Sequence, residues 1–188
     1  MAPRPRRSWV PGVVPEDART AAVLALLFPR DDEATLLLTV RGAKLSTHQG
    51  QVSLPGGAVD LGETIERAAL REAEEEIGLA PAVVTIRLRL TPLHVPVSGY
   101  VLHPIVGTAE APPAVTPAEA EVERILEVAI AALTSRPGPA IETRAHDGLA
   151  IQVPYFELGG AKLWGATAMV VAELLAVLGA PVDPWSRS

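Results

Sequence analysis

The stretch that decides the fold reads GAVDLGETIERAALREAEEEIGL, from Gly57 to Leu79. Residues 64–77 predict one helix, because Thr64 is a favourable N-cap and Gly78 is a common residue just past a helix end. At about 100° per residue, three carboxylates at i, i+3 and i+4 fall on the side that also carries small apolar residues. These carboxylates are Glu72, Glu75 and Glu76. A solvated helix places its acidic groups opposite its apolar side, so the pattern indicates a functional site.

The acidic residues also lie where a helix tolerates them least. Glu74, Glu75 and Glu76 occupy the last turn, where the helix dipole favours cations and where neighbouring carboxylates raise one another's pKa. Arg71 can reach Glu75 at i+4, but one guanidinium does not balance the carboxylates of this helix. Carboxylate oxygens without His or Cys suit a hard divalent cation, so the sequence predicts that Mg²⁺ or Mn²⁺ binds here.

The spacing of the fixed residues in this stretch resembles the Nudix box. The matching residues are Gly57, Glu63, Arg71, Glu72, Ala73, Glu75, Glu76, Gly78 and Leu79. The simpler alternative is an acidic helix exposed to solvent. The resemblance implies a Nudix hydrolase, which cleaves a nucleoside diphosphate linked to another group. It also implies an α/β fold, a Nudix-type α/β/α sandwich with a mixed sheet between helices.

The resemblance further assigns roles to residues of the box. The implied metal ligands are Glu72, Glu75, Glu76 and the carbonyl of Gly57. Glu75 is either a further ligand or the carboxylate that activates water, and it belongs to the implied catalytic residues. Arg71 is implied to serve catalysis by positioning these ligands together with Glu63.

A carboxylate on a loop distant from the box commonly serves Nudix enzymes as a further ligand or as the general base. Glu119 directly follows a Pro-rich loop at residues 109–118 and fits that place. We expect Glu119 to be the general base, with Glu75 or Glu121 as alternatives. The simpler explanation is that Glu119 is a solvated loop residue.

The segment before the box, LLTVRGAKLSTHQGQVSLPGG at residues 37–57, resembles the signature of the coenzyme A pyrophosphatase branch. The matching residues are Leu37, Leu38, Thr39, Arg41, Gly50, Pro55, Gly56 and Gly57. Three positions depart from the signature, where Gly42 replaces a small Ser or Ala, Ser46 replaces an Arg and Leu54 replaces a Phe. Residues 96–100 and 163–167 also look like segments of this branch.

The branch resemblance implies cleavage of coenzyme A or acyl-coenzyme A into 3′,5′-ADP and (acyl-)4′-phosphopantetheine. Because Ser46 removes one cation, Arg41 and Lys44 are the residues left to hold the 3′-phosphate of coenzyme A, and His48 joins them as a substrate-binding residue. The alternative is that Arg41 and His48 only stabilise the loop. Rival functions are hydrolysis of ADP-ribose or another nucleoside diphosphate derivative, and a non-catalytic nucleotide-binding Nudix module. The intact box carboxylates argue against the last.

Composition limits the class of protein. A chain of 188 residues with 48% hydrophobic residues fits one domain, expected at residues 20–181 between an extended segment at 1–19 and a tail at 182–188. No apolar run approaches the ~20 residues needed to span a bilayer, and no secretory signal is recognisable. Disulfides are excluded because Cys is absent, and the net charge of −6 disfavours nucleic acid. We expect a cytoplasmic enzyme with a small-molecule substrate and no membrane partner, and the oligomeric state, including a homodimer, stays open.

Hydrophobic patterns predict the remaining elements. The apolar run at 21–28 and the sequence TLLLTV at 35–40 predict a hairpin of two strands. Alternation at 84–90 predicts a strand with one wet face. Residues 100–107 predict another strand, in which Pro104 indicates an edge or a bulge.

Residues 122–133 fit two structures. Their apolar spacing is helical, whereas the Nudix resemblance favours a strand near 124–128 followed by a short helix, and we adopt the second interpretation. Residues 141–145 and 149–153 flank a turn and predict a hairpin. Residues 167–178 predict a final helix that ends at Gly179 and Pro181.

Overall fold

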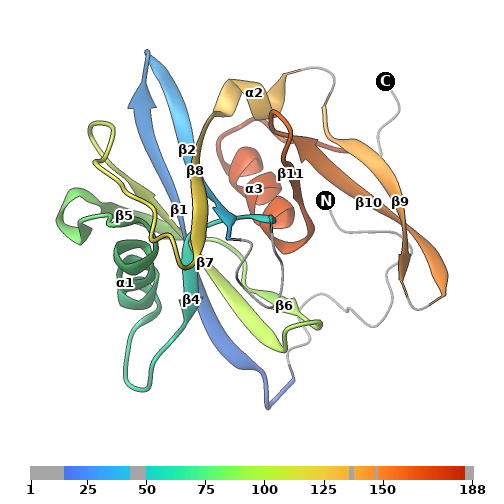
Figure 1. Ribbon diagram of the computed structural model, residues 1–188, viewed down its shortest axis with the longest axis horizontal. Helices are drawn as coiled ribbons and strands as arrows, with labels where there is room; N and C mark the ends of the chain where they lie inside the picture. The colour runs from blue at the N-terminus through green and yellow to red at the C-terminus, as the bar shows by residue number, and fades with distance from the viewer. Residues whose placement is uncertain (1–14, 43–49, 136–137, 147, 185–188) are drawn as a thin grey trace.

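The computed structural model describes residues 15–42, 50–135, 138–146 and 148–184. A large mixed sheet occupies the middle of the molecule, and a smaller antiparallel sheet lies to one side (Figure 1). The large sheet contains β1 (Arg19–Arg30), β2 (Glu33–Arg41), β3 (Val52–Ser53), β4 (Gly56–Ala58), β5 (Thr85–Arg89), β6 (Leu93–Val95), β7 (Tyr100–Thr108) and β8 (Val122–Ala129). The small sheet contains β9 (Ala140–His146), β10 (Leu149–Glu157) and β11 (Lys162–Trp164). The helices are α1 (Ile65–Ile77), α2 (Ile130–Thr134) and α3 (Gly165–Val177), with a 3₁₀ turn η1 (Pro81–Val83).

Strand β1 is the central strand and is buried on both faces. Its odd-numbered residues from Val23 to Leu27 join the core under α3, and its even-numbered residues from Ala22 to Phe28 join the core under α1. This double burial explains the continuous apolar run. β1 pairs antiparallel with β2, which confirms the predicted hairpin, and parallel with β7. The sheet is therefore mixed, as expected.

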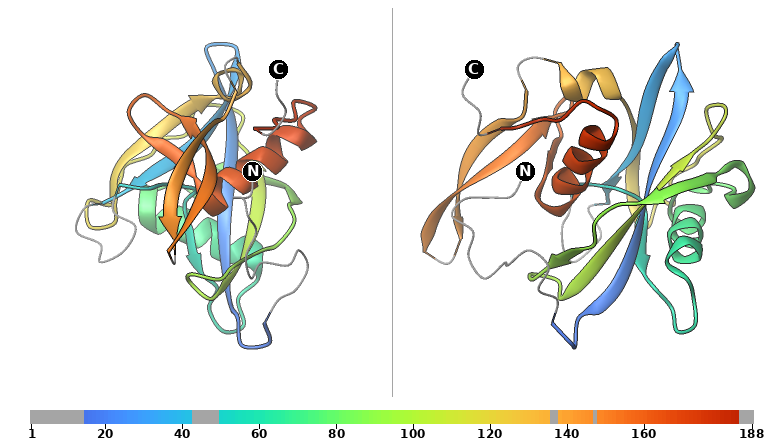
Figure 2. Two further views of the ribbon diagram at one scale, coloured as in Figure 1. Left: turned by 90° about the vertical axis from the view of Figure 1, so that its right-hand side faces the viewer. Right: turned by 180° about the vertical axis from the view of Figure 1, so that it is seen from behind.

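Helices cover both faces of the large sheet. Helix α1 packs on one face, and α3 lies between the other face and the small sheet (Figures 1 and 2). Phe156 of β10 and Leu163 of β11 are buried in the same core as the inner side of α3. The α/β class with a mixed sheet between helices is confirmed. No helix within the described ranges is long and apolar enough to cross a membrane.

The ambiguous segment at residues 122–133 forms strand β8 followed by the short helix α2, as the family resemblance implied. A bulge explains its helix-like spacing. Val40 of β2 is opposite Arg124, but Arg41 is opposite Val122, so β8 holds one extra residue. Val122 and Ile125 consequently reach the same core although they are three residues apart.

Pro104 was predicted to mark an edge or a bulge. The edge is wrong, because β7 lies between β1 on one side and β5 and β6 on the other. The pairing of β7 with β5 does contain an irregularity, but it lies opposite Val106 and Gly107 rather than at Pro104. Pro104 falls where the pairing with β6 has ended and the pairing with β5 has not begun, and its carbonyl accepts the N–H of Leu90 at 2.9 Å. The face of β5 that was predicted to be buried is only partly buried, since Ile86 is half-buried and Leu88 is 37% exposed.

Candidate active site

Helix α1 begins and ends where the sequence predicts. Thr64 is the N-cap, and its Oγ1 accepts the N–H of Arg67 at 3.3 Å. Gly78 adopts φ 65°, in the left-handed region that favours glycine, and its N–H donates to the carbonyl of Glu74 at 2.8 Å. The small residues Ala69 and Ala73 are fully buried, so the helix packs closely against the sheet.

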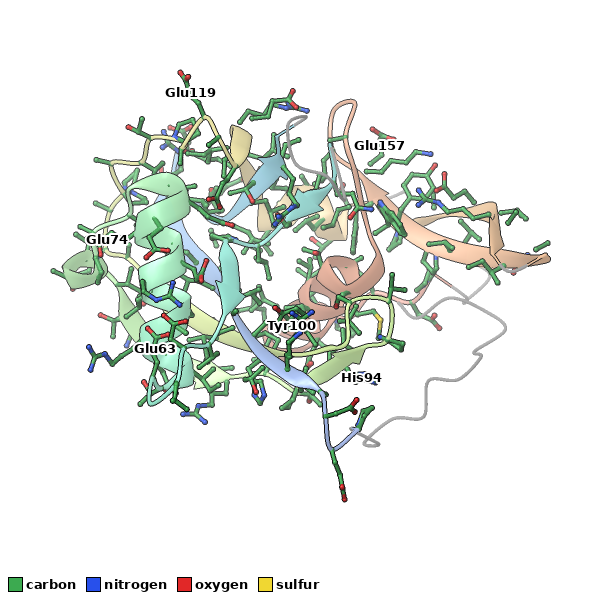
Figure 3. All side chains as sticks on the ribbon, turned by 60° about the horizontal axis from the view of Figure 1, so that its bottom comes forward. Glu63, Glu74, His94, Tyr100, Glu119 and Glu157 are labelled. Atoms are coloured by element: carbon green, nitrogen blue, oxygen red, sulfur yellow. The ribbon has the colours of Figure 1, made fainter. Side chains whose placement is uncertain are left out.

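The three box carboxylates do not share one environment. Glu76 is buried at 6% exposure, and the Glu72 side chain is 16% exposed. The Glu75 side chain is 59% exposed and lies at the flank of the helix. Glu72 and Glu76 lie against β4, whereas Glu74 is exposed to solvent (Figure 3). Two of the expected ligands therefore lie inside, and Glu75 lies at the rim.

Arg71 connects the acidic residues of this region. Its Nη1 donates to Glu72 Oε1 at 2.8 Å and to Glu75 Oε2 at 3.1 Å. Its Nε donates to Glu63 Oε1 at 3.1 Å, and its Nη2 donates to the carbonyl of Ala58 at 2.9 Å. The hydrogen bond from Arg71 lowers the pKa of Glu63. Arg71 is thus placed to fix the orientation of Glu72 and Glu75.

The Gly56–Gly57 backbone forms the other side of this acidic region. The N–H of Gly56 donates to Glu76 Oε2 at 3.2 Å. A Cβ at Gly57 would lie 2.4 Å from Glu72 Oε2, and a Cβ at Gly56 would lie 2.2 Å from the carbonyl oxygen of Ala22. Gly56 also adopts φ 152°. Gly56 therefore requires glycine, whereas a side chain at Gly57 would displace the Glu72 carboxylate, against which the Gly57 backbone lies directly.

Burial controls the electrostatics of the two inner carboxylates. Desolvation raises the pKa of Glu76 to about 7, against smaller lowering effects from the Gly56 N–H and the Arg41 charge. Burial likewise raises the pKa of Glu72, and Arg71 partly opposes it. The sequence predicted raised pKa values from mutual repulsion, whereas desolvation is the larger cause. A further positive charge nearby would favour the ionised form of both carboxylates.

A cleft of about 340 Å³ opens beside these groups. It is lined by Ala21, Arg41, Gly56, Gly57, Ala58, Glu72, Glu76, Val95, Ser98, Tyr100, Leu102 and Glu121. The carboxylates and Arg41 form a charged end, and residues of β6, β7 and the turn between them form a wall. The sequence did not predict any of these wall residues as part of the site, although residues 96–100 resemble a segment of the coenzyme A branch.

The other predicted residues have different outcomes. Arg41 lines the cleft, and its buried Nε has no hydrogen-bond partner within the described residues. Lys44 and His48 lie outside the described residues. Glu119 is exposed and points away from the cleft (Figure 3). Glu121 lines the cleft instead, and its carbonyl accepts the N–H of Gly42 at 2.8 Å.

The donor atoms of the charged end suit a hard divalent cation. The described residues of the cleft lining offer carboxylate and backbone carbonyl oxygens, and none of them offers sulfur or imidazole. Among the described residues, no three Asp, Glu or His side chains converge into an assembled metal cage. The oxygen donors present nevertheless fit Mg²⁺ or Mn²⁺, whose charge would offset the desolvation that raises the pKa values of Glu72 and Glu76.

Comparisons with known proteins agree with the box. A model of the NUDIX domain matches residues 18–142. A protein of Escherichia coli O7:K1 is 36% identical over 164 residues, which cover 86% of this chain and 83% of that protein. A protein of Enterobacter sp. (strain 638) is 38% identical over 168 residues, with coverage of 86% and 83%. Both are described as uncharacterized Nudix hydrolase NudL.

Solved structures show the same fold. RenU, a Nudix hydrolase from M. smegmatis, superimposes with a TM-score of 0.53 and 30% identity, covering 60% of this chain and 71% of RenU. A MutT/nudix family protein from Enterococcus faecalis has a TM-score of 0.55 and covers 87% of this chain and 63% of its own. At 17% identity this second likeness supports the fold alone.

Proposed function

The chain belongs to the Nudix hydrolase family, and on that premise we propose that it hydrolyses the diphosphate of coenzyme A or acyl-coenzyme A. The products would be 3′,5′-ADP and 4′-phosphopantetheine or its acyl form. Nudix hydrolases act on pyrophosphate bonds, so the family supports the reaction type. The choice of coenzyme A is our own and has its support in the segment before the box.

One observation carries the proposal: residues of both motifs line one cleft. Glu72 and Glu76 come from the box, and Arg41 comes from the preceding segment. Gly57 belongs to both motifs and lies between them. A substrate diphosphate in this cleft would therefore meet the box carboxylates and the Arg41 guanidinium together.

The metal-holding residues we propose are Glu72, Glu76 and the carbonyl of Gly57, with Glu75 as a further ligand from the rim. Nudix hydrolases generally use a divalent cation such as Mg²⁺ or Mn²⁺. When bound, such a cation supplies charge neutralisation for the diphosphate and acidifies water near the reacting phosphorus. Arg71 holds Glu72 and Glu75 in place through its two Nη1 hydrogen bonds.

The remaining residues bind the phosphate and move the proton. The Arg41 guanidinium binds a phosphate oxygen of the substrate by charge-assisted hydrogen bonds. We place the general base at Glu121, which lines the cleft, rather than at Glu119, which does not. The Glu121 carboxylate accepts the proton of the attacking water, while the bond between one phosphorus and the bridging oxygen breaks.

A substrate panel tests this function. The purified protein is incubated with Mg²⁺ or Mn²⁺ and with coenzyme A, dephospho-coenzyme A, ADP-ribose and dinucleotides, and the products are identified by mass. We expect 3′,5′-ADP and 4′-phosphopantetheine from coenzyme A at the highest efficiency. Faster hydrolysis of ADP-ribose than of coenzyme A would identify ADP-ribose as the preferred substrate and refute the proposal. Binding without turnover of any substrate would indicate a nucleotide-binding module.

A further inference from the structure

The part of the cleft lining that comes from β6, β7 and the turn between them offers contacts that a diphosphate does not need. Val95, Leu102 and the ring of Tyr100 contribute apolar surface there, next to Ser98. A diphosphate is small and strongly charged, so this wall fits a different part of the substrate. At about 340 Å³ the cleft has room for the diphosphate and one neighbouring group.

Tyr100 is held firmly in this wall by Arg19. The two residues are direct partners in the parallel β1–β7 ladder. The guanidinium of Arg19 lies over the Tyr100 ring, with Cζ 4.1 Å from the ring centroid. Its Nη2 donates to the carbonyl of Ser98 at 3.2 Å, and its backbone N–H donates to the carbonyl of Gly99 at 3.0 Å. The ring is therefore preorganised, and a ligand loses little free energy in ordering it.

The cleft connects Tyr100 with the charged end around the edge of β4. Leu102, two residues from Tyr100 on the same face of β7, packs against the core on the α3 side of the sheet. Glu72 and Glu76 instead come from the α1 side. Gly56 and Gly57 line the same cleft as the carboxylates and Tyr100 and carry no side chains, so they leave room for a ligand that contacts both. Tyr100 itself is labelled in Figure 3.

We propose that Tyr100 is the stacking platform for the base of the nucleoside in the substrate. Arg19 is a positioning residue, since it holds the ring. A flat, fixed ring suits a planar heterocycle, and base–aromatic stacking is the interaction that such a pair makes. The flexible pantetheine chain gains nothing from a fixed ring. The inference rests on the proposed function only in requiring a nucleotide substrate, and it does not require coenzyme A.

Equilibrium titration calorimetry tests the inference without turnover. The probes are 3′,5′-ADP, AMP and 4′-phosphopantetheine, each titrated into the full-length protein with Mg²⁺. Tyr100→Leu should weaken the binding of both adenine nucleotides on the order of tenfold, whereas Tyr100→Phe should retain it. Neither variant should change the affinity for 4′-phosphopantetheine.

Tyr155 offers a matched control. It is the other tyrosine of the chain, it also lies under a cation, with Lys162 Nζ 4.4 Å from the ring centroid, and it is absent from the cleft lining. Tyr155→Leu should leave all three affinities unchanged. Arg19→Gln, at an exposed position, should weaken the binding of adenine nucleotides several-fold. This variant tests the stacking platform if Tyr100→Leu does not fold.

The outcomes separate this inference from the proposed function. Unchanged nucleotide affinity in the folded Tyr100→Leu or Arg19→Gln variants overturns the stacking platform, even if coenzyme A is hydrolysed. The platform is equally overturned if the unaltered protein binds neither nucleotide or if only 4′-phosphopantetheine is affected. A protein that does not cleave coenzyme A but binds AMP through Tyr100 refutes the proposed substrate and supports the platform.

Discussion

Glu76 shows how burial and function oppose each other at a single residue. Its carboxylate is nearly excluded from solvent, and a backbone N–H is its hydrogen-bond donor within the described residues. Ionising a desolvated carboxylate is unfavourable unless a positive charge is near. A residue with this property is a candidate functional group rather than a structural one.

Replacing Glu76 should remove catalysis and leave the fold intact. Glu76→Gln removes charge and little volume, so we expect turnover to fall below detection with Mg²⁺ or Mn²⁺ while circular dichroism is unchanged. Glu74→Gln is the matched control, because Glu74 lies on the same helix, exposed and outside the cleft lining. A Glu76→Gln variant with a near-normal rate would rule out Glu76 as an essential metal ligand.

The pKa of Glu76 also predicts a pH dependence of stability in metal-free buffer. The folded pKa is about 7 and the reference value is 4.5, so the folded state binds a proton that the unfolded state releases between these pH values. The stabilisation is present below pH 4.5 and is lost as pH rises through about 7. The difference corresponds to about 3 kcal/mol. Urea unfolding at pH 5.5 and 8 should show about 2 kcal/mol of this loss in the unaltered protein, because part of it has already occurred below pH 5.5, and a smaller loss in Glu76→Gln.

Glu119 and Glu121 differ in what their loss should do. If Glu121 is the base, Glu121→Gln should reduce turnover, leave the metal titration unchanged and give a rate that still climbs at alkaline pH, where hydroxide replaces the base. Glu119→Gln should behave as the unaltered protein, because Glu119 lies outside the cleft lining. Rescue of Glu121→Gln by excess Mn²⁺ would instead make Glu121 a ligand, and a defect confined to Glu119→Gln would restore the original expectation.

At the scale of elements, local signals predicted α1 well and β8 poorly. The caps of α1 are nearest-neighbour features, so Thr64 and Gly78 define its ends from sequence alone. The bulge in β8 depends on how it pairs with β2, which no local pattern records. The sequence favoured Glu119 as the base because it follows the Pro-rich loop. It could not indicate Glu121, because the pairing of β8 beside Arg41 is what brings Glu121 to the cleft.

Strand β4 should tolerate no side chain at Gly57. Gly57→Ala places a methyl group 2.4 Å from the present position of Glu72 Oε2, so Glu72 must move. We expect activity to fall at least on the order of a hundredfold, whereas thermal unfolding should change little, because the displaced group is the end of a flexible side chain. Gly138→Ala is the control, because nothing lies within 4 Å of the added carbon. Normal activity in Gly57→Ala would mean that the Glu72 position is unimportant.

For the whole molecule, the Nudix resemblance implied a mixed sheet between helices, and the structure confirms this. They did not indicate that β9, β10 and β11 form a separate sheet beyond α3, because a hairpin signal does not say which sheet it joins. Likewise Pro104 was expected at an edge or a bulge, whereas a break between two partner strands accommodates it.

Metal binding should stabilise the entire fold. A cation that binds only the folded state adds about 2.7 kcal/mol at a concentration a hundred times its Kd, which corresponds to a rise in Tm of roughly 5–10 °C for a chain of this size. Differential scanning fluorimetry with Mn²⁺ should show this rise for the unaltered protein and for Glu74→Gln, and a much smaller one for Glu76→Gln. Equal shifts in all three would place the cation elsewhere.

The parallel pairing of β1 with β7 has a consequence for the order of folding. Arg19 and Tyr100 are ladder partners separated by 81 positions, and the whole of α1 lies in the loop that their pairing closes. Closing a flexible loop of that length costs about 4 kcal/mol of chain entropy. Contacts so distant in sequence form late in folding. The cleft lining includes Ala21 of β1 and Tyr100 of β7, so the cleft is complete only after the two ends of this long loop have met.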